Sequence, residues 1–416
     1  MVGQRGIATF QRNIAFFGSF YPRIDRLATT STGMVYLMSK CQDIKDVTVL
    51  GPSGSRIPGN YPSNVKIEPI WEYDDIPSLI RTLFFLLREG KKFDVIFFNL
   101  ILTSFGRRKL SNATGLLIPP LLSILAHKKP VVYIHNLVET QDIRKLGYGN
   151  AHVSKLLARV LERLLFGTTH IILPLESQRK TIERIYGTRV DQALFVGVEG
   201  IWTLKNYMRA NNSSTLYNLG KIRILLFGAW GPQKDVVSIL RMLKTLTLRV
   251  TNLHVIVAGS INQNFPEYRE KLSRTFMELD PGIFSFIENP KEELVPELFI
   301  NSDILILPYN AAGGYSAVMN VARLYCVKIL AYDIEELREI ARTIDVNVDF
   351  IPRDNNESLE KAIRYFLWEP KLRGADSELA ELIARGEDRM IGIIEKFSMD
   401  DKSQTDRRGG WEPLHL

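Results

Sequence analysis

The sequence contains few cysteines and no apolar run long enough to span a membrane. Cys41 and Cys326 are the only cysteines in 416 residues, and two distant thiols do not form a disulfide framework, so we expect a reducing, cytoplasmic location. The longest apolar stretch, residues 113–126, contains Pro119-Pro120 and is shorter than the about 20 residues that a membrane-spanning helix needs. Residues 1–12 lack an apolar core and a small-residue cleavage site, which predicts no secretory signal.

Nucleic-acid-binding motifs are also missing, although the chain is basic. Its net charge of +7 and its isoelectric point near 9.2 favour anionic partners such as nucleotide diphosphates and lipid head groups. The basic residues are spread along the chain rather than clustered, so we expect no nucleic-acid partner.

One segment combines apolar and basic residues. Residues 113–126 are flanked by Arg107-Arg108-Lys109 and by His127-Lys128-Lys129. Apolar residues between bases could contact an anionic membrane surface, which makes residues 107–129 a candidate for peripheral contact with the inner face of a membrane. A buried helix-turn-helix with solvated ends, broken at Pro119-Pro120, explains the same pattern, and we favour it.

Short apolar runs alternate with longer amphipathic stretches through the first half of the chain. The runs rich in β-branched residues predict strands at 13–18, 47–51, 65–70, 93–98, 130–135 and 170–174. The spacing of apolar residues predicts helices at 32–41, 76–89, 153–166 and 177–186. Strands that are apolar on both faces and alternate with helices indicate a parallel sheet covered on both sides.

The second half repeats this pattern after a polar stretch, residues 206–220, that is typical of a linker. The predicted strands are 222–227, 253–258, 284–287, 304–307 and 328–332, and the predicted helices are 236–247, 266–279, 291–301, 318–325 and a final helical region at 357–397. The fold class is therefore α/β with two doubly wound, Rossmann-like domains. We place them at 1–200 and 201–370, followed by C-terminal helices at 371–399 that cross back to the first domain and a polar tail at 400–416.

Two doubly wound domains in tandem create a central cleft. Ligands of such sheets bind beyond the carboxyl ends of the strands. The loops after Phe17, Ile134, Phe227, Ala258 and Leu307 are therefore expected to face a shared cleft.

Several stretches of the second half occur in an order that resembles family 4 and related GT-B glycosyltransferases. Residues 227–235 (FGAWGPQKD) are similar to a strand-end loop that carries a glycine and then a lysine before a helix. Residues 253–259 resemble the next strand, which runs into a glycine, and residues 292–309 resemble a helix, a strand and a Pro-Tyr pair. Residues 313–322 and 329–333 look like the donor loop with its helix and the following strand. The first half matches less closely, through Tyr21-Pro22 and a strand that ends in His135.

This resemblance implies a GT-B enzyme that transfers a hexose from a UDP- or GDP-sugar to a glycan or lipid-linked acceptor. It further implies retention of configuration, and no metal or other cofactor. The first domain would face the acceptor and the second would bind the donor. Charge that grows on the leaving diphosphate needs a fixed cation and backbone N–H groups. By resemblance the catalytic residues are His135 and Lys234. The donor-binding residues are Gly18, Gly228, Lys234, Gly259, Gly313, Gly314, Tyr315, Ser316 and Asn320, and the acceptor-side residues are Asn136 and Glu139.

Simpler interpretations stand beside these roles. Lys234 could be a solvated lysine in a turn, and Gly18 could belong to an ordinary tight turn. His135 at a strand end could be hydrogen-bonded to the backbone. The Ser316 hydroxyl could bind phosphate or cap the following helix, and we favour the cap.

The chain also departs from the family pattern. Two glutamates that bracket the donor loop in many members are replaced by Ala312 and Asn320, and the usual arginine after the first glycine of the second domain is replaced by Ala229 or Trp230. The chain is therefore either a divergent active branch, which we favour, or a catalytically impaired binding subunit. A GT-B nucleotide-sugar epimerase is a third alternative, although it would need additional acidic and histidine groups and the chain has six histidines.

Overall fold

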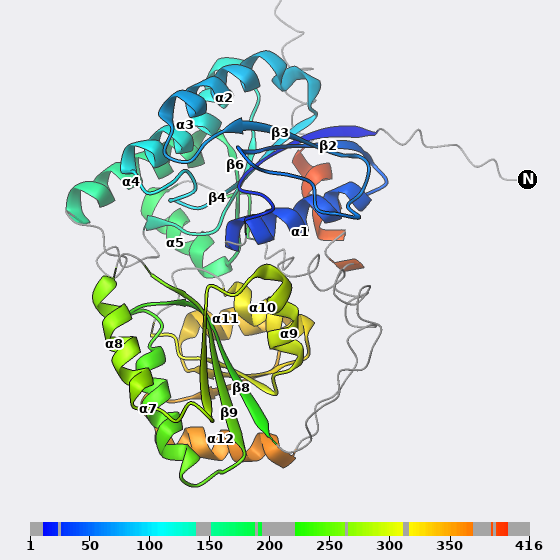
Figure 1. The fold of residues 1–416 in the computed structure, drawn as a ribbon. Helices are drawn as coiled ribbons and strands as arrows, with labels where there is room; N and C mark the ends of the chain where they lie inside the picture. The colour runs from blue at the N-terminus through cyan, green and yellow to red at the C-terminus, as the bar shows by residue number, and fades with distance from the viewer. Residues whose placement is uncertain are drawn as a thin grey trace, which may run out of the picture. The chain divides into compact units, whose positions relative to one another are not determined.

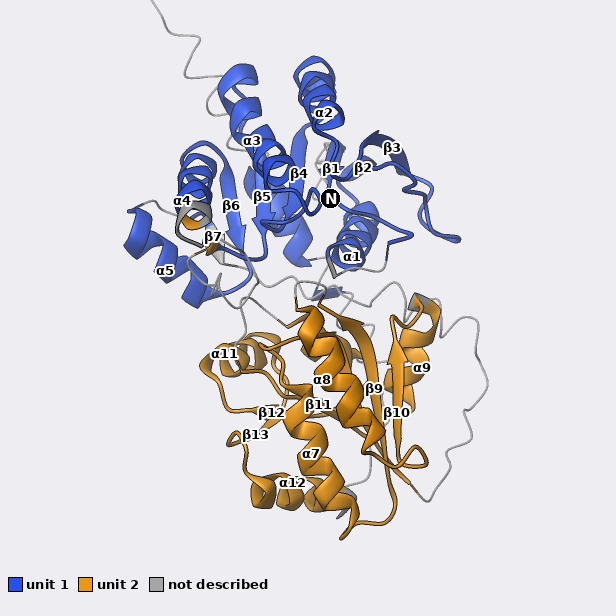
Figure 2. Ribbon diagram, turned by 60° about the vertical axis from the view of Figure 1, so that its left-hand side comes forward, with its two compact units in different colours: residues 1–137, 156–198, 382–416 blue, residues 138–155, 199–381 orange. Residues whose placement is uncertain are grey.

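The computed structural model describes residues 11–23, 26–138, 151–187, 190–193, 221–262, 265–310, 316–368, 384–385 and 388–397. The chain divides into two compact units (Figure 2). Unit 1 comprises residues 1–137, 156–198 and 382–416, and unit 2 comprises residues 138–155 and 199–381. Residues 388–397 thus group with unit 1, where the Lys396 ammonium donates to the Asp191 carbonyl at 3.1 Å.

Unit 1 is a seven-stranded parallel sheet in the order β3-β2-β1-β4-β5-β6-β7 (Figure 1). Its strands are β1 (Arg12–Phe17), β2 (Ile44–Pro52), β3 (Val65–Trp71), β4 (Val95–Leu100), β5 (Val131–Ile134), β6 (His170–Leu173) and β7 (Gln192–Ala193). Its helices are α1 (Arg26–Lys40), α2 (Ile76–Glu89), α3 (Lys109–Ala126), α4 (Ala151–Thr168) and α5 (Glu176–Tyr186). One core cluster joins alternate residues of the strands to Leu79 of α2, Leu116 of α3, Leu165 of α4 and Ile182 of α5. These four helices therefore cover the same face of the sheet.

Unit 2 is a six-stranded parallel sheet in the order β10-β9-β8-β11-β12-β13. Its strands are β8 (Ile222–Trp230), β9 (Leu253–Ile261), β10 (Phe284–Glu288), β11 (Ile304–Leu307), β12 (Lys328–Tyr332) and β13 (Val348–Ile351). Its helices are α7 (Val236–Thr247), α8 (Pro266–Met277), α9 (Val295–Ile300), α10 (Ala317–Leu324), α11 (Glu335–Ile344) and α12 (Asn356–Trp368). The prediction of two doubly wound parallel sheets is thus confirmed.

The strand order of each sheet reverses once. In unit 1 the chain moves outward from β1 to β3 and then starts again on the other side of β1 with β4; in unit 2 it does the same at β8 and β11. The loops after the two strands at a reversal diverge to opposite faces, which opens a crevice at their carboxyl ends where ligands of such sheets bind. Each unit therefore has one preferred ligand position.

The predicted helix-turn-helix at 113–126 is wrong. α3 continues through Pro119 and Pro120, which remove two backbone donors from the helix. Both prolines are buried, and the Phe105 ring packs so closely on Gly115 that a Cβ there would lie 2.3 Å from it. Tertiary packing therefore holds together a helix that local sequence preference would interrupt.

Two predicted strand ends in unit 2 are also wrong. β8 and β9 were expected to stop at Phe227 and Ala258, but they pair for three further residues, with Gly228 opposite Gly259. A Cβ on Gly259 would lie 1.8 Å from the Gly228 carbonyl oxygen, and both glycines have positive φ angles, 152° and 141°. The strands continue because neither residue has a side chain that would push them apart. The sequence analysis also missed α11 and β13, where charged residues interrupt the apolar pattern.

We expect Gly259→Ala to destabilise unit 2 by more than about 3 kcal/mol, since it combines steric overlap with backbone strain. Urea unfolding monitored by circular dichroism measures the loss. Gly167→Ala is the matched control, because Gly167 lies in α4 and a Cβ added there would meet no other atom within 4 Å, so the change should be neutral or stabilising by up to about 1 kcal/mol. A loss below about 1 kcal/mol for Gly259→Ala would contradict the close contact.

Candidate functional site

In unit 2 the loop after β8 is tied to the end of β11, the strand at which the order reverses. The backbones of Lys234 and Tyr309 form an antiparallel bridge. The Asp235 N–H donates to the Pro308 carbonyl and the Asn310 N–H donates to the Gln233 carbonyl, both at 2.9 Å. Asp235 also caps α7 by accepting from the Ser238 N–H at 3.2 Å. The loop that carries Lys234 is therefore fixed at both ends.

The Lys234 ammonium lies at this crevice. Its Nζ is 4.4 Å from the centroid of the Tyr309 ring and 3.2 Å from the position that a Cβ on Gly228 would take. The side chain is half-buried, and within the described ranges no carboxylate lies within ion-pair distance of it. The face of an aromatic ring attracts an ammonium and helps to hold it in place. Gly228 leaves the space beside that charge open, so the two predicted donor residues lie together.

Ser316 and Asn320 lie at and within α10. Ser316 occupies the N-cap position, but its side chain makes no capping bond; its Oγ lies 3.4 Å from the Tyr309 hydroxyl instead. The favoured capping role of this hydroxyl is therefore wrong. Asn320 is buried. Gly313, Gly314 and Tyr315, predicted as the donor loop, lie outside the described residues.

Gly259, another predicted donor residue, is explained by strand packing, since it lies against the Gly228 carbonyl. Three residues that the sequence analysis did not assign lie nearby. Trp230 Nε1, Gln233 Oε1 and Asn310 Oδ1 are buried atoms without a hydrogen-bond partner among the described residues. Buried polar atoms are ordinarily satisfied, so they are candidates to bind a ligand or water. The signal available in the sequence was their position, at the end of β8 for Trp230 and in the loops after β8 and β11 for Gln233 and Asn310.

In unit 1 His135 directly follows β5, the neighbour of β4, which is one of the two strands at the reversal. Its backbone N–H donates to the Leu100 carbonyl at 3.0 Å, and its ring Nε2 lies 2.6 Å from Asn99 Oδ1. Asn99 is in turn bound to Ser31 of α1, with Nδ2 2.9 Å from the Ser31 hydroxyl oxygen. All three side chains are buried. The simpler interpretation, a hydrogen bond to the backbone, describes the N–H of His135. The ring Nε2 bonds to the Asn99 side chain instead.

This network defines the protonation of the imidazole. Asn99 Nδ2 also faces the Leu27 carbonyl at 3.5 Å, and a carbonyl can only accept, so the amide oxygen of Asn99 points at His135. An oxygen acceptor requires His135 Nε2 to carry a proton. Asn99, which the sequence analysis missed, thus orients the predicted catalytic histidine.

Gly18 and Asn136 complete the structure around this histidine. A Cβ on Gly18 would lie 3.2 Å from both the Asn99 carbonyl oxygen and the Ser31 hydroxyl, so a side chain there would press on the network. The Asn136 amide oxygen accepts from the Leu102 N–H at 2.9 Å, which joins the loops after β4 and β5. Glu139, the other predicted acceptor-side residue, lies outside the described residues.

Comparison with known proteins finds similarity in structure only. No protein-family model and no curated protein matches the sequence. Similar solved structures include Anabaena HepE in complex with UDP and glucose, at 12% identity over 95% of this chain and 100% of that chain with a TM-score of 0.59. The trehalose-phosphate synthase (UDP-forming) of Burkholderia vietnamiensis has 10% identity, 94% and 98% coverage and a TM-score of 0.61. WaaG, a glycosyltransferase involved in lipopolysaccharide biosynthesis, has 12% identity, 92% and 98% coverage and a TM-score of 0.53.

The chain therefore has the GT-B fold, with two Rossmann-like domains. Each similar structure is covered over nearly its whole length. Identities near one residue in ten establish the fold and leave the reaction to be argued from the site.

We expect His135 to carry its proton on Nε2. Spectra of ¹⁵N-histidine-labelled protein that correlate the ring nitrogens with the ring protons distinguish the two tautomers, and His135→Gln identifies the signal. Asn99→Ala should remove the preference for a proton on Nε2, because no acceptor then faces this nitrogen. A wild-type signal from a ring protonated on Nδ1 would contradict the orientation of Asn99.

Proposed function

We propose that the chain is a retaining glycosyltransferase that needs no metal and transfers a hexose from a UDP- or GDP-sugar to a glycan or lipid-linked acceptor. The observation that carries the proposal is the Lys234 ammonium, stacked on Tyr309 beside Gly228 at the strand-order reversal of unit 2. That is the position at which doubly wound sheets bind phosphorylated ligands. The reaction releases a nucleoside diphosphate, so a cation at this position stabilises the leaving group.

The surroundings of Lys234 suit a leaving diphosphate. Charge that develops on the departing β-phosphate is stabilised most by a group already held in place, because no reorganisation is then needed. The bridge to Tyr309 and the bond from Asp235 to Pro308 hold the Lys234 backbone. α10 begins at Ala317, directly after Ser316, whose Oγ lies 3.4 Å from the Tyr309 hydroxyl, and the N-terminal end of a helix adds partial positive charge.

The choice of donor is supported by the similar structures. The Anabaena protein HepE has been crystallised with UDP, with UDP-glucose and with UDP and glucose. We propose UDP-glucose as the first donor to test for this chain, with a GDP-sugar as the comparison. Proton NMR of the product's anomeric signal measures the configuration of the new bond. A product of inverted configuration would refute retention.

A catalytically impaired binding subunit is the second candidate. Asn320 replaces a glutamate of the resembled family and is buried in α10, where a neutral amide can bind a hydroxyl but cannot supply charge. The two candidates differ in turnover. An enzyme slowly hydrolyses its sugar nucleotide when acceptor is absent, whereas a binding subunit binds UDP-sugar without releasing UDP.

We expect Lys234→Ala to weaken UDP binding by about 1 to 3 kcal/mol, since it removes a charge-assisted hydrogen bond. Isothermal titration measures the affinity. Lys244→Ala is the control in the same domain, because Lys244 lies on α7 with its side chain 49% exposed, and it should bind UDP as the wild type does. Unchanged affinity of Lys234→Ala would remove this lysine from the donor site.

The Tyr309 ring should contribute to UDP binding. We expect Tyr309→Leu to weaken UDP binding by about 0.5 to 2 kcal/mol because the Lys234 ammonium loses its aromatic support, while Tyr309→Phe retains most of the affinity. In the Lys234→Ala background the Leu substitution should have little further effect, since the interacting cation is absent. Equal losses in both backgrounds would show that the ring acts independently of Lys234.

A further inference from the structure

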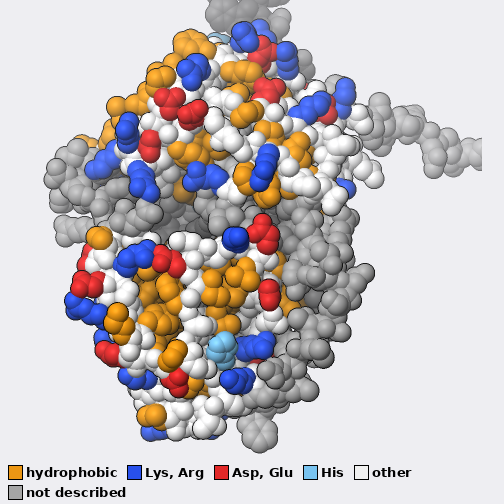
Figure 3. Space-filling model, in the orientation of Figure 1, with side chains coloured by type: hydrophobic (Ala, Val, Ile, Leu, Met, Phe, Trp, Pro, Cys, Tyr) orange, Lys and Arg blue, Asp and Glu red, His pale blue; other side chains and the backbone are white. Residues whose placement is uncertain are grey.

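Three helices of unit 1 expose apolar side chains on one surface. α2, α3 and α4 cover the same face of the sheet, and α3 lies between the other two in both Figure 1 and Figure 2. Their outward large apolar residues, which we call the outer helical face, are Ile80 and Phe84 of α2, Leu110, Ile124 and Leu125 of α3, and Leu156, Leu157 and Val160 of α4. Figure 3 shows hydrophobic and basic side chains, with some acidic ones, interspersed along the border of unit 1 where these helices lie.

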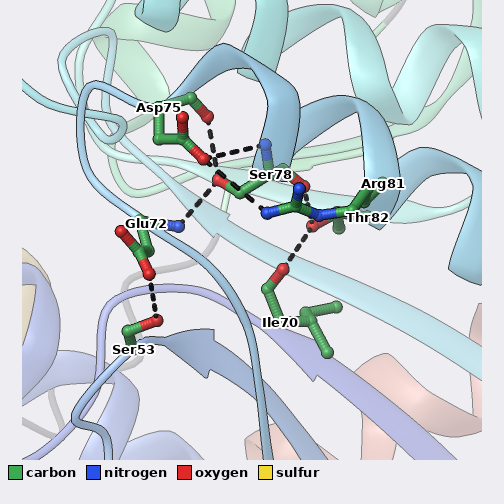
Figure 4. A network of polar contacts seen from close by, with 7 residues as sticks. All are labelled: Ser53, Ile70, Glu72, Asp75, Ser78, Arg81 and Thr82. Carbon is green, nitrogen blue, oxygen red and sulfur yellow. Dashed lines mark hydrogen bonds and ion pairs between the residues drawn. The ribbon is translucent and has the colours of Figure 1, made fainter.

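α2 shows that this exposure is unusual for a surface helix. It buries the hydroxyl residues Ser78 and Thr82 together with Leu79 and Leu86, while Phe84 is 65% exposed. The buried hydroxyls have partners in the polar network of Figure 4: Ser78 Oγ accepts from the Glu72 N–H at 2.9 Å, and Thr82 Oγ1 lies 3.3 Å from the Ile70 carbonyl. Asp75 caps the same helix through the Ser78 N–H at 3.0 Å. The network thus fixes α2 with polar groups inward and Phe84 outward.

The charges on the three helices of the outer helical face are mostly positive. The sequence from residue 95 to residue 138, which includes all of α3, contains no aspartate or glutamate. In α4 the one acid, Glu162, is 1% exposed and accepts from the Tyr186 hydroxyl at 2.8 Å. The acids of α2 and its cap are engaged with cations, Glu89 with Arg88 and Lys92 and Asp75 with Arg81. The exposed basic residues that surround the apolar ones are Arg81, Arg88, Lys91, Lys92, Arg107, Arg108, Lys109, Arg159 and Arg163.

We propose that the outer helical face docks on an anionic lipid surface. Exposed apolar side chains among cations, without exposed acids on α3 and α4, match the boundary between acyl chains and anionic head groups. This surface is wider than the segment 107–129 and includes two further helices.

The helix at the centre of this surface lies on the membrane rather than across it. α3 is long and apolar enough to cross a bilayer, the only such helix in the described part of the chain. However, Leu116, Ile118 and Leu122 belong to the core of unit 1, so α3 cannot leave the domain without exposing that core. Contact parallel to the membrane surface uses its outward residues Leu110, Ile124 and Leu125 while the core stays intact.

A second copy of the chain fits this surface less well. A symmetric dimer places the same patch of two subunits against each other, so the basic residues around it would meet their own copies. Like charges at an interface oppose association, and α3 and α4 offer no exposed acid to balance them. An anionic lipid surface supplies the missing negative charge.

Vesicle flotation of the full chain tests the proposal. Vesicles of phosphatidylglycerol and phosphatidylcholine should carry the protein to the top of the gradient, whereas vesicles of phosphatidylcholine alone should bind it at least about ten-fold more weakly. Binding should fall when the salt rises from about 0.05 M to about 0.5 M, since screening weakens contacts between exposed charges.

Substitutions test whether the outer helical face is the surface that binds the vesicles. Phe84→Ser with Leu125→Ser should reduce binding roughly ten-fold or more, because burial of each side chain contributes about 1.5 to 3 kcal/mol. Arg108→Glu with Lys109→Glu should reduce binding to the anionic vesicles. Leu248→Ser with Met277→Ser is the control, since these apolar residues of unit 2 are 83% and 85% exposed and lie outside the outer helical face. All of these residues are exposed, and an unchanged circular dichroism spectrum shows that each variant is folded.

Two results would overturn the proposal. One is binding that is unaffected by both pairs of changes in unit 1, or equally reduced by the control. The other is a dimer, measured by light scattering, that Phe84→Ser with Leu125→Ser dissociates while vesicles are not bound. UDP titration of the same variants should match the wild type, so failure of membrane docking and failure of the glycosyltransferase proposal are distinguished.

Discussion

The contact between the loop after β8 and the end of β11 is the constraint on which the candidate site depends. Strand order reverses at these two strands, so their loops would otherwise diverge. The bridge from Lys234 to Tyr309 and the hydrogen bonds around it hold the two loops together. They place the Lys234 ammonium over the Tyr309 ring. The same closure requires Gly228 and Gly259, since side chains on either would separate β8 from β9 or press on the lysine. In unit 2 the packing of β8 against β9 and the position of the Lys234 ammonium therefore depend on the same two glycines.

The two units use the same topology for different chemistry. In unit 1 the reversal holds a buried chain of hydrogen bonds that runs from Ser31 through Asn99 to the His135 imidazole. In unit 2 it holds a half-buried cation. Imidazole nitrogens can bond to sugar hydroxyls, which both donate and accept, and a cation suits phosphate. The division agrees with the proposed transfer from a nucleotide-sugar, in which one ligand carries charge and the other does not.

The sequence predicted the two sheets well because buried parallel strands read as continuous apolar runs. It failed where long-range packing overrides local preference: at Pro119 and Pro120, which the contact between Phe105 and Gly115 keeps inside one helix, and at the ends of β8 and β9, which depend on paired glycines. At the site, Lys234 and His135 could be named from motifs. Their partners Tyr309 and Asn99 could not be assigned, because each pairing joins different strands and no local pattern encodes which side chains meet across a sheet.

The proposed membrane docking and the proposed lipid-linked acceptor are consistent with each other. A lipid-linked acceptor is confined to a surface, so an enzyme that docks there meets it at a raised effective concentration without any additional contact to it. The outer helical face belongs to unit 1, which also holds His135, and Lys234 belongs to unit 2. In the two proposals, basic residues act on different ligands: those on α2, α3 and α4 attract lipid head groups, whereas Lys234 attracts a soluble nucleotide. The net charge of +7 is then a sum of separate functions, and neither could be inferred from the total.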